Sequence, residues 1–226
     1  MFSLPETGYK KGKGAYPMIS FSDPSTLMHA VTDIGDSAVL GAVVLAAACY
    51  FIAAGCFAEA VAVALSFLLT SAAIGLLKVA FLSCGHDFLD IRSPSGHAAL
   101  SVAVLGTFGL ILHSLHKRWH RFLWPGLLGI LGAAIVVTRI ALGYHSFAEV
   151  AAGVVVGLCV LPAIWLFVLR RGRHSGHPRF NIYLLLAVTF AAIFLTYGER
   201  LPAEKNFNKI AAQIRAHFPV CREGQQ

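Results

Sequence analysis

Residues Pro94-Ser95-Gly96-His97 stand directly before the apolar run AALSVAVLG. A helix that begins here presents unpaired backbone N–H groups and the positive end of its dipole, which together bind phosphate. Gly96 lets a ligand approach that backbone closely, Ser95 adds a hydroxyl donor, and His97 could protonate a leaving alkoxide. The simpler alternative is that Ser95 is an ordinary N-cap with no ligand.

A second set of polar residues occupies 138–149, in the segment TRIALGYHSFAE. Arg139 could hold phosphate oxygens with its planar fork. A neutral His145 could attack phosphorus if its other ring nitrogen donates to an acceptor such as Glu149. Each feature also has a structural alternative. Arg139 could be a cation that reaches toward headgroups, and Glu149 could form a capping box with Ser146.

Two further cations, Lys78 and Arg92, stand beside the same apolar segments. A charge at membrane depth costs about 2.5 to 3.5 kcal/mol on insertion scales, so polar residues beside apolar spans are where chemistry is expected. We expect both cations to join Arg139, His97 and His145 in one anion site that contains two imidazoles. Lys78 and Arg92 could instead face lipid headgroups or water.

The elements that position these residues follow from the composition. The chain has 226 residues, of which 57% are hydrophobic and only 13% charged, and its mean hydropathy is +0.71. This composition excludes an ordinary soluble enzyme. The formal charge of +7 is then assigned to a membrane surface and not to nucleic acid. We predict an all-α polytopic membrane protein with six transmembrane helices in one bundle, at 37-57, 60-82, 98-116, 122-142, 147-169 and 180-198.

Three segments follow from these spans: an N-terminal interfacial segment at 1-36, a six-helix membrane domain at 37-198 and a C-terminal amphipathic tail at 199-226. The loops KRWHR and RRGRHSGHPR hold seven Lys/Arg and lie on one side, which we assign to the cytoplasm. The candidate site then faces outward, as it would toward the periplasm from a bacterial cytoplasmic membrane. The five Lys/Arg residues of the C-terminal tail oppose this orientation.

Two of the five cysteines, Cys84 and Cys221, fall on the predicted outer face. A disulfide between them would survive in an oxidising compartment and would hold the tail near the site. The alternative is two unrelated thiols.

The two motifs resemble those of the type 2 phosphatidic acid phosphatase (lipid phosphate phosphatase) superfamily. The family pattern is Lys, six residues, Arg-Pro; then Pro-Ser-Gly-His; then Ser-Arg, five residues, His, three residues, Asp. This chain matches the second part at 94–97 and the third as Thr138-Arg139, five residues, His145, three residues, Glu149. The first part departs from the pattern, because Gly85 and His86 stand where Arg-Pro would follow Lys78.

The resemblance implies a role for each matched residue. His145 would be the nucleophile that forms a phosphohistidine, Glu149 would orient it, and His97 would protonate the leaving lipid oxygen and then activate water. The phosphate would be held by Lys78, Ser95, Gly96 and Arg139. Arg92 is the nearest cation that could replace the missing arginine. The resemblance implies no metal or other cofactor, since the cations stabilise the developing charge.

We therefore expect a membrane phosphatase that hydrolyses a lipid phosphate or pyrophosphate at the outer face. Its expected partners are that substrate and membrane lipids, with no nucleic acid, and the sequence leaves the oligomeric state open. Two alternatives remain. A small anion transporter or channel would carry ionisable residues near mid-bilayer, and a non-catalytic lipid-phosphate-binding relative is compatible with the altered first motif.

Overall fold

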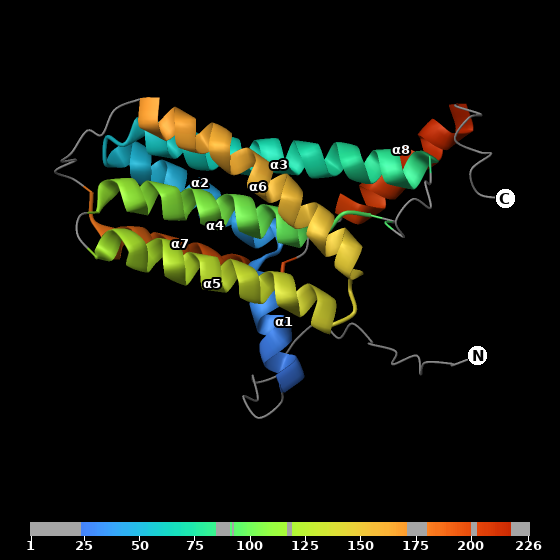
Figure 1. Ribbon diagram of the computed structural model, residues 1–226, viewed down its shortest axis with the longest axis horizontal. Coiled ribbons are helices and arrows are strands. Elements are labelled where there is room, and N and C mark those ends of the chain that lie inside the picture. The colour runs from blue at the N-terminus through green and yellow to red at the C-terminus, as the bar shows by residue number, and fades with distance from the viewer. Residues whose placement is uncertain are drawn as a thin grey trace.

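The chain forms a bundle of helices that run along the long axis of the molecule (Figure 1). The computed structural model describes residues 24–84, 91, 93–116, 119–170, 180–199 and 203–217. Its elements are α1 (Pro24–Ile34), α2 (Ser37–Ala53), α3 (Phe57–Cys84), α4 (Gly96–Leu115), α5 (His120–Ala141), α6 (Phe147–Arg170), α7 (Ile182–Thr196) and α8 (Ala203–His217).

Each of the six predicted spans coincides with a helix, but the helices differ in length. Within the described residues, α3, α4, α5 and α6 are long and apolar enough to cross a membrane. The 17 residues of α2 qualify only together with α1, to which α2 is joined at a bend of 47°. The 15 residues of α7 span about 22 Å, less than the roughly 30 Å of a bilayer core. The described residues therefore contain four candidate spans, or five if the bent α1–α2 pair forms one span.

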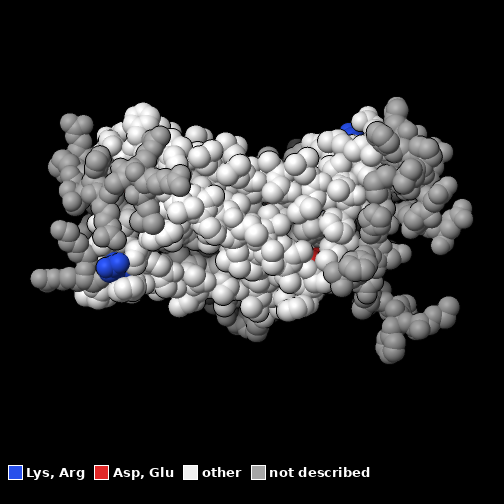
Figure 2. Space-filling model, turned by 45° about the horizontal axis from the view of Figure 1, so that its top comes forward, with Lys and Arg blue, Asp and Glu red and all other residues white. Residues whose placement is uncertain are grey.

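The surface pattern agrees with a membrane protein. Figure 2 shows one face of the molecule. The few charged side chains on this face lie near the two ends, with an uncharged band between them. Large apolar side chains such as Leu76, Phe190 and Leu195 are more than two-thirds exposed. An exposed apolar surface of this kind is stable against hydrocarbon and costly in water.

Helix α4 lies at the centre, packed against α3, α5 and α6. Of the four long apolar helices, α4 is the most buried, with 67% of an 18-residue apolar stretch inside the bundle. Its contact with α6 is close because Gly153 and Gly157 form a small-xxx-small pair. A Cβ at Gly153 would overlap the Ser95 carbonyl oxygen, and one at Gly157 would lie 2.6 Å from the Ala99 oxygen. These two glycines therefore set the position of α6 on the start of α4.

The junction between α1 and α2, residues 32–36, is called here the elbow. Asp36 ends it as the N-cap of α2, where its Oδ1 accepts a hydrogen bond from Ala38 N at 2.8 Å. A Cβ at Gly35 would lie 2.6 Å from Ile135 Cγ2 on α5 and 2.9 Å from Ser101 Oγ on α4. The elbow is therefore wedged against both helices, and any larger residue at position 35 would move it.

The opposite end of the α4–α5 pair is joined by a side-chain clamp. Pro125 cannot donate to the carbonyl of Arg121, four residues before it. His113 Nδ1 donates to that carbonyl at 3.0 Å, and Arg121 Nη2 donates to His113 Nε2 at 2.9 Å. The clamp holds α4 and α5 together at the end away from the predicted site.

The C-terminal tail contains the predicted helix, α8, and it packs on α3. Phe207 lies against Gly75, and Ala211 is fully buried. Ile210, three residues after Phe207, is 44% exposed. Cys221 and the side chain of Cys84 lie outside the described residues, so the predicted bridge falls there too.

Candidate active site

The predicted site residues come from four helix ends that meet at one end of the bundle, toward the right in Figure 1. Helices α3 and α5 end there, and α4 and α6 begin there. Lys78 lies in the last two turns of α3, and Arg139 lies in the last turn of α5. The sequence motifs at 94–97 and 138–149 therefore lie at the same end, as their positions in the chain predicted.

Ser95 and Gly96 form the start of α4. Ser95 is fully buried and is the N-cap, with its Oγ 3.5 Å from Ala98 N. A Cβ at Gly96 would lie 3.6 Å from Ile74 Cγ2 and 4.0 Å from Lys78 Cε, so Lys78 lies beside the start of α4. Lys78 is only 8% exposed. A buried ammonium beside the positive end of a helix is an arrangement suited to an anion.

A tight turn after α5 presents His145. Gly143 adopts a left-handed conformation with φ 67°, which ends α5 and reverses the chain within five residues. His145 Nδ1 lies 2.9 Å from Glu149 Oε2, and both side chains are 11% exposed. Because the carboxylate fixes the proton on Nδ1, the lone pair of the neutral ring is on Nε2.

The two alternatives for Glu149 are both present. Its Oε2 also accepts from Ser146 N at 3.2 Å, while Glu149 N donates to Ser146 Oγ at 3.2 Å, which completes a capping box. The second oxygen, Oε1, accepts from Ser93 N at 3.0 Å, and the Glu149 carbonyl accepts from Ser95 N at 3.0 Å. Glu149 therefore caps α6, contacts His145 and joins the two motifs.

The electrostatic surroundings keep His145 neutral. Burial lowers the pKa of His145, the hydrogen bond and charge of Glu149 raise it, and the Arg139 and Lys78 charges lower it. The net direction is down. A neutral imidazole is the form that can act as a nucleophile.

Arg139 is held in place from two sides. Its guanidinium carbon lies 4.5 Å from the centre of the Tyr144 ring, and Nη1 lies 3.4 Å from Thr32 Oγ1 in the elbow. Tyr144 in turn contacts His29 of α1, with its hydroxyl 3.2 Å from Nδ1. Helix α1 thus supports the arginine of the site.

His97 lies beside a carboxylate that the sequence analysis did not select. Its Nε2 is 3.4 Å from Asp36 Oδ2, and the two side chains are 25% and 14% exposed. The available signal was Asp36-Ser37 directly before an apolar run, which is typical of an N-cap and gives no sign of a site. Nothing in the sequence singled out Thr32 or Tyr144, because their contacts with Arg139 depend on how α1 and α5 pack.

Arg92, predicted to bind phosphate, lies outside the described residues. Gly85 and His86, where the first motif departs from the family pattern, lie outside them as well.

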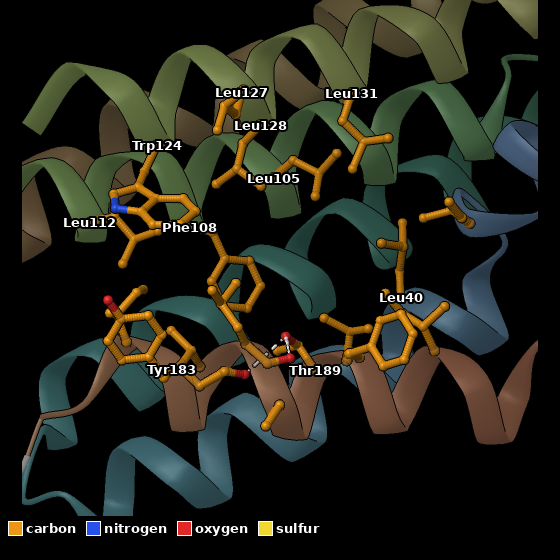
Figure 3. A pocket seen from close by; sticks show the side chains of 18 residues that line it. Leu40, Leu105, Phe108, Leu112, Trp124, Leu127, Leu128, Leu131, Tyr183 and Thr189 are labelled. Carbon is orange, nitrogen blue, oxygen red and sulfur yellow. Dashed lines mark hydrogen bonds between the residues drawn. The ribbon is translucent and has the colours of Figure 1, made fainter. Parts of the chain in front are cut away.

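An apolar cavity lies on the side of the elbow away from the site, between α5 and α7, and is also lined by residues of α2 and α4 (Figure 3). Its volume is about 630 Å³. Side chains of α5 and α7 point into it from opposite sides, and Thr189, one of its few polar groups, donates to the Leu185 carbonyl at 2.9 Å. Along α7 the lining runs from Ile182 to Ile193, about 16 Å.

The cavity and the site lie along the same faces of α4 and α5. Residues four apart lie on one face of a helix, one turn or about 5 Å from each other. On α4 the order is His97 at the site, Ser101 against the elbow and Leu105 in the cavity. On α5 the same order is Arg139, Ile135 and Leu131. The elbow therefore lies between the polar residues of the site and the apolar cavity, one turn from each along both helices.

Comparison with known families matches the PAP2 superfamily over residues 56–173, just over half of the chain. The matched range includes Lys78, both motifs and Glu149, whereas Thr32 and Asp36 precede it. Searches of curated proteins and of solved structures give no match. The family match agrees with the geometry of the two motifs, and the chain belongs to the PAP2 superfamily.

Proposed function

We propose that this protein is a metal-independent phosphatase that hydrolyses a lipid phosphate or pyrophosphate through a phosphohistidine at His145. Membership of the PAP2 superfamily supports phosphatase activity in general. The observation that carries the proposal is the buried His145–Glu149 pair, 2.9 Å apart, with Lys78 and Arg139 close enough to act on the charge of the histidine.

The first step is phosphoryl transfer to the enzyme. The Nε2 lone pair of His145 attacks phosphorus, the P–O bond to the leaving group breaks, and His97 gives that oxygen a proton. Lys78, Arg139, the Ser95 hydroxyl and the N–H group of Gly96 stabilise the charge on the transferred group. Glu149 holds the Nδ1 proton of His145 and so balances the positive charge that the ring acquires.

The second step restores the enzyme. His97, now neutral, takes a proton from water, whose oxygen attacks phosphorus as the N–P bond breaks. Inorganic phosphate leaves and His145 returns to its neutral form. No step needs a metal, because the cations of the site supply the electrostatic stabilisation.

The apolar cavity supports an amphiphilic substrate over a water-soluble phosphate. Its volume falls within the range of small-molecule sites, and its lining offers almost no polar group to a polar ligand. A lipid whose phosphate lies level with Arg139 would place its hydrocarbon chain about two turns further along the bundle, past the elbow, at the level of Leu131 and Leu105.

The proposed location is a bacterial cytoplasmic membrane with the site toward the periplasm. The support is the basic character of the segments KRWHR and RRGRHSGHPR, which connect α4 to α5 and α6 to α7 in the chain. A non-catalytic lipid-phosphate-binding relative is the second candidate, and the replacement of Arg-Pro by Gly85 and His86 favours it.

Phosphate release separates the two candidates. Purified protein in detergent or vesicles is given a panel of lipid monophosphates and pyrophosphates, with EDTA present, and compared with His145→Ala. We expect release by the parent enzyme and none by the variant. Binding without release by the parent would favour the non-catalytic candidate, and activity that EDTA abolishes and a divalent metal restores would contradict the mechanism.

A further inference from the structure

Asp36 occupies a position in the site that neither the motifs nor the family match covers. The match begins at residue 56, while Asp36 closes the elbow between α1 and α2. Its two oxygens have different partners: Oδ1 accepts from Ala38 N at 2.8 Å, and Oδ2 lies 3.4 Å from His97 Nε2. One carboxylate thus connects the start of α2 to the histidine of α4.

The position of this carboxylate is fixed from several sides. Gly35, the preceding residue, is wedged between Ile135 and Ser101, and Asp36 N donates to the Asp33 carbonyl at 3.1 Å. The Asp36 side chain is 14% exposed. A carboxylate held by backbone contacts can in turn hold a histidine ring in one orientation and one tautomer.

We propose that Asp36 is the positioning residue of His97, the group that exchanges a proton with the leaving oxygen and with water. The inference rests on the proposed function. With Nε2–H directed at Asp36 Oδ2, Nδ1 is the nitrogen that gives the proton to the leaving group and later takes one from water. A carboxylate thus faces the ring of the acid as Glu149 faces the ring of His145, at the 3.4 Å distance of an ion pair in place of the 2.9 Å hydrogen bond of His145.

This assignment gives the elbow a second function beside supporting Arg139 through Thr32. The segment before the family match therefore contributes to both the phosphate-holding and the proton-transferring sides of the site. Asparagine at position 36 would remove the charge beside His97 and keep the shape of the side chain.

The test is Asp36→Asn, which keeps an N-cap as good as aspartate for α2 but removes the charge that faces His97. The matched control is Asp33→Asn, the same change three residues earlier. Asp33 faces another partner, since burial and the Asp33 charge together raise the pKa of Tyr197.

Two substrates separate a proton-transfer defect from a structural one. An alkyl lipid phosphate leaves as a strongly basic alkoxide that needs a proton, whereas p-nitrophenyl phosphate leaves as a weakly basic phenolate that does not. Values of kcat/KM report only the steps up to formation of the phosphoenzyme, so the later water step does not enter the comparison. Inhibition by inorganic phosphate independently measures binding by the phosphate-holding residues, among them Lys78 and Arg139.

We expect Asp36→Asn to lower kcat/KM for the alkyl substrate roughly tenfold to a hundredfold and to leave the aryl substrate within about threefold of the parent. Inhibition by phosphate should stay within about twofold, and Asp33→Asn should match the parent on both substrates. Equal losses on both substrates, or no loss on the alkyl one, would overturn the assignment. A parent enzyme inactive on both substrates would instead overturn the proposed function, and the assignment with it.

Discussion

At the residue scale, one carboxylate combines a structural and a chemical task. The sequence presented Glu149 as either a cap or an orienting residue, and the structure shows both, because Oε2 reaches Ser146 N and His145 Nδ1 together. A sequence pattern could identify both partners but not their sharing of one atom. That sharing depends on the turn at Gly143 and on the rotation of α6.

The environment of His145 predicts a pH dependence. The active form is the neutral ring, and the pKa of His145 is lowered by burial and by Arg139 and Lys78, against Glu149. Activity is therefore retained as the pH falls through 6.5, the ordinary value for histidine, and is lost only below it. We expect the acid limb of kcat/KM, corrected for ionisation of the substrate, to lie below pH 6.5.

Glu149→Gln tests the direction in which Glu149 shifts the pKa of His145. Glu149 raises the pKa of His145, so removing its charge should move the acid limb to still lower pH while also reducing the maximal rate. An acid limb at or above pH 7 in the parent, or a shift to higher pH in Glu149→Gln, would contradict this description of the site.

At the element scale, the apolar runs located helices at all six predicted spans, because hydropathy and length are properties of local sequence. The elbow was not predicted as part of the site. Its contribution comes from tertiary contacts, such as Gly35 against Ile135 and Asp36 beside His97, which no periodicity encodes. The short length of α7 was also missed, since the helix begins after the Asn181 cap and ends at Thr196, two residues inside each limit of the predicted span.

The close α4–α6 contact predicts a sharp effect of one methyl group. Gly153→Ala places a Cβ onto the Ser95 carbonyl oxygen, so α6 must move away from the start of α4 and strain the Ser95–Glu149 hydrogen bond. We expect a loss of about 1 to 3 kcal/mol in stability and at least tenfold in kcat/KM. Thermal unfolding and phosphate release measure the two effects.

The control is Gly129→Ala on α5, where an added Cβ meets nothing within 4 Å. Alanine is the better helix former, so this variant should be as stable as the parent or slightly more stable. If Gly153→Ala behaves like Gly129→Ala, the contact between α4 and α6 does not determine the geometry of the site.

The apolar cavity predicts a dependence on chain length. Leu131→Trp fills the end of the cavity nearest the elbow, so long-chain substrates should lose at least about fivefold in kcat/KM while a short-chain analogue is unaffected. Ile130→Trp makes the same change on the neighbouring residue, which is 70% exposed, and should change neither substrate. An equal effect of Leu131→Trp on long and short chains would show that the cavity does not hold the tail.

At the scale of the whole molecule, the basic segments KRWHR and RRGRHSGHPR predict how the bundle is oriented across the membrane. Two single cysteines are introduced separately into a cysteine-free variant. Glu199→Cys places one just beyond α7, at the end that holds the site, and Trp119→Cys places the other at the opposite end. A membrane-impermeant maleimide added to intact spheroplasts should label the first and should label the second only after permeabilisation. The reverse pattern would place the proposed site toward the cytoplasm.

The central claim is that phosphate passes through His145, and the most direct measurement is to trap it there. Enzyme mixed with its substrate is quenched in alkali, where a phosphohistidine survives, and its peptides are analysed by mass spectrometry. We predict one phosphoryl group on His145 in the parent and in Asp36→Asn, and none in His145→Ala. Turnover without a phosphorylated peptide, or a phosphoryl group on another residue, would contradict the account.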